Sequence, residues 1–109
     1  MRLPVLKGTL DLLVLRALSW APMHGFEILS SLERAAHEPL GIDDSALYQA
    51  LYRLEAKGLV ASRLGEPTAE RGGRAKRHFQ IEAEGERALT ISQEAIRQMA
   101  VGLPRWRRA

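Results

Sequence analysis

The side chains that could do chemistry in this sequence are cations, amides and hydroxyls rather than nucleophiles or metal ligands. The chain has no cysteine, and its three histidines, His24, His37 and His78, are scattered along it. Neither a thiolate metal site nor a histidine ligand cluster is therefore expected. The sequence also lacks a phosphate-cradling glycine loop and a nucleophile accompanied by a base in a motif context. We expect no enzymatic activity, no metal and no cofactor.

One predicted helix, from about Asp44 to Lys57, collects polar side chains on one side. Leu47, Leu51 and Leu54 form its buried stripe, because residues three and four apart share a helix face. The opposite side is expected to present Ser45, Tyr48, Gln49, Tyr52 and Arg53. A glutamine can bond to N6 and N7 of adenine, a serine at a helix start can hold a phosphate, and an arginine can reach base edges or backbone. Ser45, Tyr48, Gln49 and Arg53 are therefore the residues of this helix that we predict to contact DNA.

Each of these side chains also has a purely structural interpretation. Tyr48 could cover its own helix, and the serine and the glutamine could simply be solvated. Arg53 could form an ion pair with Glu55 or Glu33, worth about 1 kcal/mol or less. We favour DNA contact for Tyr48 and Arg53, and both interpretations stay open for the serine and the glutamine.

The formal net charge is only +3, but the cations are unevenly placed. Four of them surround Gly72-Gly73, namely Arg71, Arg74, Lys76 and Arg77. Concentrated cations at a hairpin tip suit close approach to a phosphate chain or a minor groove, although a solvated loop is the structural alternative. We assign DNA contacts to Arg74, Lys76 and Arg77. Arg63, on the opposite strand, is a further candidate.

Helices and two short strands must position these residues. Apolar spacing, caps and prolines predict four helices. They are one after Gly8-Thr9 that stops at Trp20-Ala21-Pro22, one from near His24-Gly25 to before Pro39, one from about Asp44 to Lys57, and one from Ala83 to Gly102-Pro104. Asp43 is the expected N-cap of the third helix, and Gly58 its left-handed C-terminal residue. Asp11 is expected to favour the first turn of the first helix.

The two strands form a predicted hairpin. One opens at Leu59-Val60, and the other carries Phe79 and Ile81 in alternation with polar residues, as a half-buried strand does. Helix, helix, turn, helix and basic hairpin in that order is the layout of a winged helix-turn-helix. The fold class is therefore mainly α with a small β-hairpin, in which residues 1–82 form a DNA-binding domain, 83–104 a last helix and 105–109 a basic tail.

Several separated motifs carry a resemblance to a known family. They are Gly8-Thr9-Leu10, Met23-His24-Gly25-Phe26-Glu27-Ile28, Leu47-Tyr48-Gln49-Ala50-Leu51-Tyr52-Arg53-Leu54-Glu55, Gly58-Leu59-Val60, Gly73-Arg74, Arg77-His78-Phe79 and Glu84-Gly85. Together, over roughly Leu6 to Leu89, they resemble the PadR family of transcriptional regulators. The resemblance implies a repressor in the cytoplasm that binds a palindromic DNA operator.

The last helix has apolar residues on more than one stripe, which would face water in a lone peripheral helix. A partner is therefore implied, and the resemblance makes it a second copy, with two recognition helices about 34 Å apart. The interface residues expected are Leu89, Ile96, Met99 and Leu103. In the family, an effector can enter beside this helix and lower DNA affinity. Trp20 and Met99 could line such a site for a small hydrophobic or aromatic molecule, although core packing is their plainer role.

Two other functions remain open at this point. A winged-helix module that binds protein would keep the leucine stripe and the last helix but would not require the basic hairpin. A small-molecule carrier would bind ligand independently of DNA, contrary to reciprocal linkage. The longest apolar runs fall far short of the roughly 20 residues of a membrane span, and no signal peptide is recognised. A soluble, intracellular protein is expected.

Overall fold

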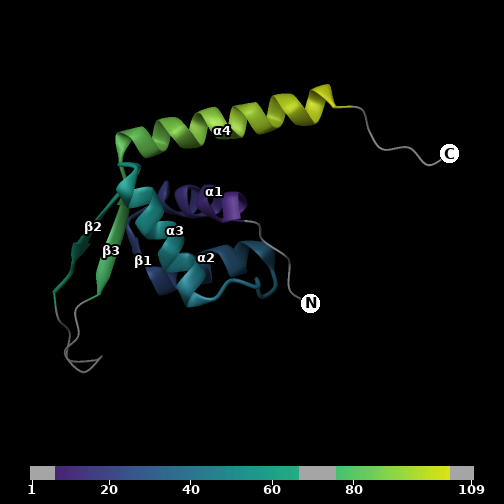
Figure 1. Ribbon diagram of the computed structural model, residues 1–109. Coiled ribbons are helices and arrows are strands. Elements are labelled where there is room, and N and C mark those ends of the chain that lie inside the picture. The colour runs from purple at the N-terminus through teal and green to yellow at the C-terminus, as the bar shows by residue number, and fades with distance from the viewer. Residues whose placement is uncertain (1–6, 67–75, 104–109) are drawn as a thin grey trace.

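Four helices and a small antiparallel sheet make up the described part of the chain, residues 7–66 and 76–103 of a computed structural model. In chain order they are α1 (Lys7–Leu18), β1 (Met23–His24), α2 (Gly25–Ala36), α3 (Asp44–Ala56), β2 (Val60–Leu64), β3 (Arg77–Ile81) and α4 (Ala83–Gly102). The arrangement, shown in Figure 1, confirms the predicted mainly helical winged helix-turn-helix with its hairpin. We call the β2–β3 hairpin the wing.

Short-range contacts set the bounds of α2 and α3, the two helices of the helix-turn-helix. The Asp43 carboxylate accepts a hydrogen bond of 2.7 Å from the N–H of Ala46 at the start of α3, and Gly58 takes a φ of +76° after its end. Both features confirm the sequence prediction. His24 begins α2 with a capping box, in which its ring nitrogen and Glu27 bond to each other's backbone N–H. His24 is thus the N-cap of α2, at the predicted start of that helix.

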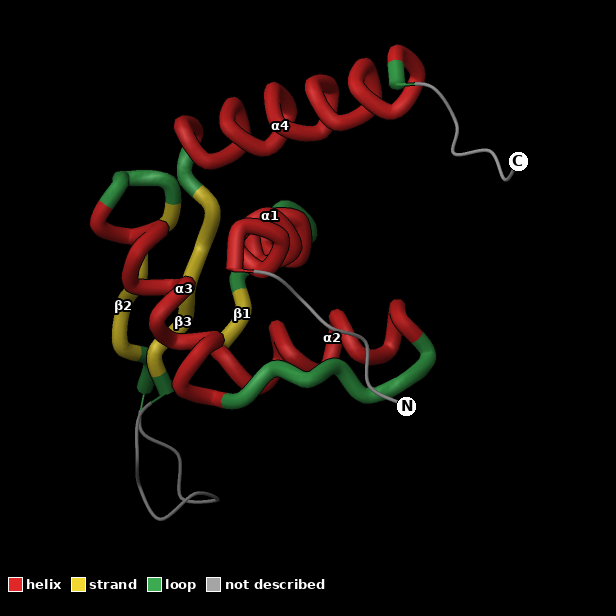
Figure 2. Tube along the Cα trace, turned by 45° about the vertical axis from the view of Figure 1, so that its right-hand side comes forward, coloured by secondary structure: helices red, strands yellow, loops and turns green. Residues whose placement is uncertain are grey.

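Helix α1 lies at the centre of the fold (Figure 2), with α4 on one side, α2 on the other and α3 with the sheet beside it. Apolar side chains from all these elements form one core, and its fully buried large members are Phe79, Leu18, Ile28, Leu47, Leu51, Val14 and Val60. The helix begins at Lys7, earlier than predicted, so Asp11 is not in its first turn. The predicted role of Asp11 at the helix start is therefore wrong.

The sheet has three strands rather than the predicted two, in the order β1-β3-β2. The additional strand is Met23–His24, which pairs antiparallel with β3 so that Met23 lies opposite Phe79. Two residues have too little local signal to predict a strand. They become one because β3 supplies the hydrogen-bonding partners, and this pairing fixes α2 against the base of the wing.

Helix α4 starts against the domain and then leaves it. The N–H of Glu82 donates to the carbonyl of Leu59 at 2.9 Å, and Leu89 is only 5% exposed because it packs into the core of its own chain. The expectation that Leu89 faces a second copy is therefore wrong. The apolar residues beyond it that are exposed are Ile91, Ile96, Met99, Val101 and Leu103.

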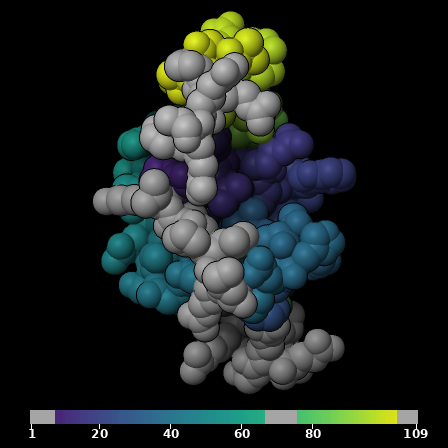
Figure 3. Space-filling model, turned by 90° about the vertical axis from the view of Figure 1, so that its right-hand side faces the viewer, coloured from purple at the N-terminus to yellow at the C-terminus, as the bar shows by residue number. Residues whose placement is uncertain are grey.

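Figure 3 shows α4 standing at one end of the molecule, above α1. Helix α4 is the longest helix of the fold, with 20 residues. Across residues 7–66 and 76–103, no helix is both long enough and apolar enough to cross a membrane.

Candidate nucleic-acid interface

The outward face of α3 is narrower than the sequence suggested. Its buried residues are Leu47, Ala50, Leu51 and Leu54. The exposed residues opposite them are Ser45, Gln49, Tyr52 and Ala56, at intervals of four, three and four, which is the spacing of a single stripe on a helix. We call these four residues the outward stripe. It is the surface that α3 can offer to a DNA groove.

Two of the predicted contact residues, Ser45 and Gln49, lie in the outward stripe. Tyr52 lies there too, but it was not predicted to contact DNA. Tyr52 is 52% exposed, and its ring leans against the rings of Tyr48 and Phe79, with centroids 6.1 and 6.4 Å away. A signal was present in the sequence, since Tyr52 is one residue beyond the buried Leu51 and three beyond Gln49. The outward stripe therefore offers a hydroxyl, an amide and a phenol.

Tyr48 is half-buried rather than outward-facing, which corrects its predicted placement. Its ring packs on the core between Gly25 and Phe79, with ring centroids 6.3 Å apart in the aromatic pair. A Cβ at Gly25 would lie 2.7 Å from the ring carbon that bears the hydroxyl, so this glycine makes room for the tyrosine. Tyr48 thereby joins α3 to α2 and to the sheet, and the structural interpretation accounts for its position.

Arg53 lies on the other flank of α3 and is engaged with Asp11 of α1. Its Nη2 donates to Oδ1 at 2.5 Å and its Nε to Oδ2 at 3.4 Å, so the guanidinium binds the carboxylate through two donors. The predicted partners Glu55 and Glu33 are used elsewhere, because Glu55 accepts from Ser62 and Glu33 accepts from the N–H of Leu40. Arg53 thus holds α3 on α1, and its predicted placement toward DNA is corrected.

Replacing Asp11 by asparagine is expected to lower the free energy of unfolding by about 1–2 kcal/mol, because it leaves a half-buried guanidinium without its counter-charge. Arg97→Gln is the matched control. Arg97 also binds a carboxylate, Glu94, through two donors, but the pair is 67% and 49% exposed, against 27% and 20% for Arg53 and Asp11. Its loss is expected to change stability by less than about 0.5 kcal/mol. Equal effects in urea unfolding would contradict this ranking.

The wing cations divide between its two faces. Arg77 lies at the start of β3 and is exposed, and its guanidinium donates to the Ser62 hydroxyl at 3.1 Å. Lys76 is half-buried, with its Nζ 3.3 Å from Nε2 of His24. Arg63 is exposed on β2. Arg74, the remaining predicted contact, lies outside the described residues, as does Arg71.

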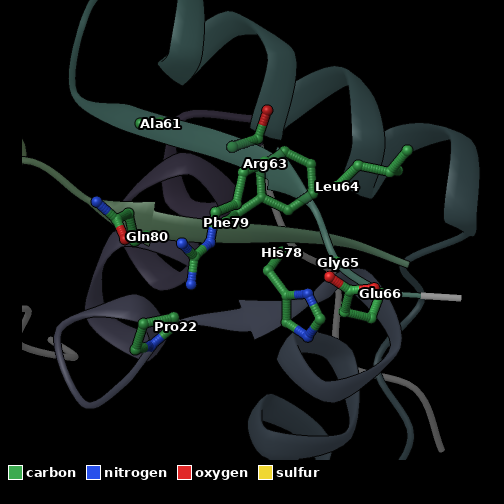
Figure 4. A pocket seen from close by; sticks show the side chains of 10 residues that line it. Pro22, Ala61, Arg63, Leu64, Gly65, Glu66, His78, Phe79 and Gln80 are labelled. Atoms are coloured by element: carbon green, nitrogen blue, oxygen red, sulfur yellow. The ribbon is translucent and has the colours of Figure 1, made fainter. Parts of the chain in front are cut away.

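Two cavities accompany these surfaces. One, of about 540 Å³, is a hollow on the outer face of the sheet, where Arg63, His78 and Gln80 project toward the side of Pro22 (Figure 4). The other, of about 430 Å³, is a groove between α1 and α4 whose lining includes Leu12 and Met99. Among the described residues no group of three or more histidines and carboxylates could hold a metal ion.

The two residues considered for an effector site are separated by the structure. Met99 lines the groove between α1 and α4, whereas Trp20 lines neither cavity and is 81% exposed after the end of α1. Core packing for Trp20 is therefore wrong, and its place in an effector site is not supported. Met99 belongs to α4 and is 56% exposed, so core packing is wrong for it too, and its part in an effector site stays a prediction.

Comparisons with known proteins agree on one family. The model of the transcriptional regulator PadR-like family matches residues 14–91, although no relative with a curated description matches the sequence. A PadR family transcriptional regulator from Eggerthella lenta is 28% identical, with a TM-score of 0.74 over 88% of this chain and 79% of that one. A transcriptional regulator from Clostridium thermocellum is 26% identical, with a TM-score of 0.75 over 86% and 85%.

A protein from Streptococcus mutans shares the fold over 98% of this chain and 100% of its own, at 22% identity and a TM-score of 0.72. The similarity therefore extends beyond the helix-turn-helix and the wing into α4. The family match covers the outward stripe, the wing strands and the buried Leu89. The chain belongs to the PadR-like family of DNA-binding transcriptional regulators.

Proposed function

We propose that this regulator is a repressor that binds a palindromic operator as a homodimer, with α3 in the major groove and the wing against the backbone. The observation that carries the proposal is the outward stripe. Its polar members, Ser45, Gln49 and Tyr52, are exposed along one line of α3, while Leu47, Ala50, Leu51 and Leu54 on the opposite side are buried. Gln49 is assigned to a base. Its amide can donate to N7 of an adenine and accept from N6 of the same base, which makes a two-bond contact in the major groove.

Residues 1–82 are proposed as the DNA-binding unit and 83–104 as the dimerisation helix. Ile96 and Met99 on α4, and Leu103 directly after it, are exposed, and the first two line the groove against α1. A second α4 related by a two-fold axis would cover these side chains and remove their apolar surface from water. The axis would also place two copies of α3 about one turn of DNA apart, so that each reads one half-site.

Release by a small molecule is proposed at the same groove. Its volume of about 430 Å³ suits a small organic ligand. Its walls belong to α1 on one side and α4 on the other, with Leu54, Lys57 and Leu59 also in the lining. A ligand that binds better when these helices separate would shift the spacing of the two copies of α3. By linkage it would then lower DNA affinity, and DNA would lower ligand affinity by the same factor.

The test is a titration of a fluorescent duplex that the protein enriches from a random pool, against a scrambled duplex, at roughly 150 mM salt to damp nonspecific attraction. Gln49→Ala is expected to weaken binding to the enriched duplex about tenfold or more, because one bidentate base contact is worth about 1–3 kcal/mol. Gln80→Ala is the control, since this glutamine is also exposed but lies on the outer face of the sheet. Its affinity is expected to stay unchanged.

Failure to enrich any duplex, or equal binding to both duplexes, would contradict the proposal and favour the protein-interaction module. Equal losses of affinity in Gln49→Ala and Gln80→Ala would contradict only the assignment of Gln49 to a base, not the proposed function. A ligand that binds tightly with no change in affinity when DNA is added would favour the carrier.

A further inference from the structure

The two faces of the wing can be told apart by strand register. Ser62 lies opposite Phe79 and Leu64 opposite Arg77, while Arg63 lies opposite His78. Directly opposed residues project from the same face of a sheet, and successive residues alternate. Phe79 is fully buried in the core beneath α3, so Ser62, Leu64 and Arg77 share the face on the side of α3. Arg63 and His78 project from the other face.

A chain of hydrogen bonds crosses the α3-side face. The Ser62 hydroxyl donates to Oε2 of Glu55 on α3 at 2.6 Å. The oxygen of that hydroxyl also accepts a bond from Nη1 of Arg77 at 3.1 Å. A hydroxyl has one proton to donate and lone pairs to accept, so Ser62 can make both bonds at once. Ser62 and Glu55 are half-buried, whereas Arg77 is exposed. The three residues connect the last turns of the recognition helix to the first residue of β3.

We infer that Ser62 and Glu55 are positioning residues that hold the Arg77 guanidinium beside α3, where it meets one phosphate of the operator backbone. The inference rests on the proposed function, because it supposes that α3 enters the groove. A free arginine side chain must lose much of its rotamer freedom when it binds. Arg77 has already lost part of that freedom to Ser62, so the bond to a phosphate costs less ordering than it would from an untethered position.

Arg63 is assigned the opposite role. It belongs to the same hairpin and carries the same charge, but it projects from the outer face into the hollow beside Pro22 and Gln80 (Figure 4). Among residues 7–66 and 76–103 its side chain has no hydrogen-bond or ion-pair partner. The geometry therefore predicts that two arginines of one wing differ in DNA contact because of the strand face on which each stands.

The first experiment compares Arg77→Gln with Arg63→Gln on the enriched duplex across a series of salt concentrations. Loss of one phosphate contact is expected to reduce the salt slope of the binding constant by about one. We expect this reduction, with a fivefold to tenfold weaker affinity at about 150 mM salt, for Arg77→Gln only. Equal slopes and affinities in the two variants would overturn the assignment.

The second experiment tests Ser62. Ser62→Ala is expected to weaken binding about threefold to tenfold, in keeping with one hydrogen bond to a charged group, while Ser62→Thr, which keeps the hydroxyl on a residue suited to a strand, is expected to bind like the parent protein. In an Arg77→Gln background, Ser62→Ala should cause no further loss, because its effect passes through Arg77. A merely structural serine would give the same loss in both backgrounds.

A loss on Ser62→Ala that is additive with Arg77→Gln, or no loss at all, would overturn the inference while leaving the proposed function intact. Failure of the parent protein to prefer the enriched duplex would instead refute the proposed function. Glu55→Gln keeps an oxygen that accepts from Ser62 and is expected to bind within about twofold of the parent protein. Thermal unfolding of each variant separates folding defects from weaker DNA binding.

Discussion

Gly85→Ala is expected to lower the free energy of unfolding by about 3 kcal/mol, at the upper end of the usual effect of overpacking. A Cβ at this position would overlap the carbonyl oxygen of Leu59 and lie 2.8 Å from Cγ1 of Ile81. The carbonyl cannot readily move aside, because it accepts the hydrogen bond from the N–H of Glu82 that starts α4. The first turn of α4 must therefore shift, and the burial of Leu89 shifts with it.

The measurement is thermal unfolding, where a loss of this size corresponds to a drop in Tm of about 10–20 °C for a chain of this length. Gly102→Ala is the matched control, because it makes the same change at the other end of α4, where no other element of the described residues comes within 4 Å of the added Cβ. It is expected to leave stability unchanged or to raise it by up to about 1 kcal/mol, as alanine favours a helix over glycine. If both alanines raised stability, the contact of α4 with Leu59 would not determine where α4 docks.

Ile96→Glu is expected to convert the proposed dimer into monomers and to weaken operator binding about a hundredfold or more. The side chain lines the groove against α1. A two-fold interface would bury two copies of the new carboxylate, and taking a charged group out of water costs far more than burying isoleucine. A monomer can hold one half-site only, so the second recognition helix no longer adds to the affinity. Sedimentation velocity measures the first effect and duplex titration the second.

Ile91→Glu makes the same substitution on a different face of the same helix. Ile91 is exposed and lies five residues before Ile96, about 140° away around the helix. Its neighbours on that face are Glu94 and Gln98. The Arg97 guanidinium bonds to Glu94 and holds the pKa of that carboxyl below its ordinary value. Charged and amide side chains therefore surround Ile91 on this face. Ile91→Glu is expected to remain a dimer, and dissociation in both variants would contradict the proposed interface.

The residues that sequence reasoning predicted well are those whose structure depends on near neighbours in the chain. Asp43 caps α3 by bonding to an N–H three residues away, and Gly58 follows the helix in a left-handed conformation that glycine adopts without strain. The alternation around Phe79 likewise predicted a strand with one buried face. Such signals are contained in a few consecutive residues, which is why the order of elements and the class of fold were predictable.

The side chains that were placed wrongly make contacts with residues far away in the chain. Asp11 binds Arg53 across 42 positions, and Tyr48 packs against Gly25. Periodicity places a residue within about a quarter turn of a helix face, which cannot separate an outward side chain from one on a flank. Tyr48 and Arg53 were therefore both placed on the outward face, whereas they lie on its flanks with partners on the neighbouring helices and the sheet.

The sequence by itself determined the elements, their order, the leucine stripe that buries α3 and the cations of the wing, because helix, turn and strand preferences act over a few residues. Only the tertiary structure decided which side of each element is free. It added the strand Met23–His24 by pairing it with β3, buried Leu89 in its own chain and set Arg77 and Arg63 on opposite faces of one hairpin. Burial and pairing depend on which distant segments pack together, and that information is absent from local spacing.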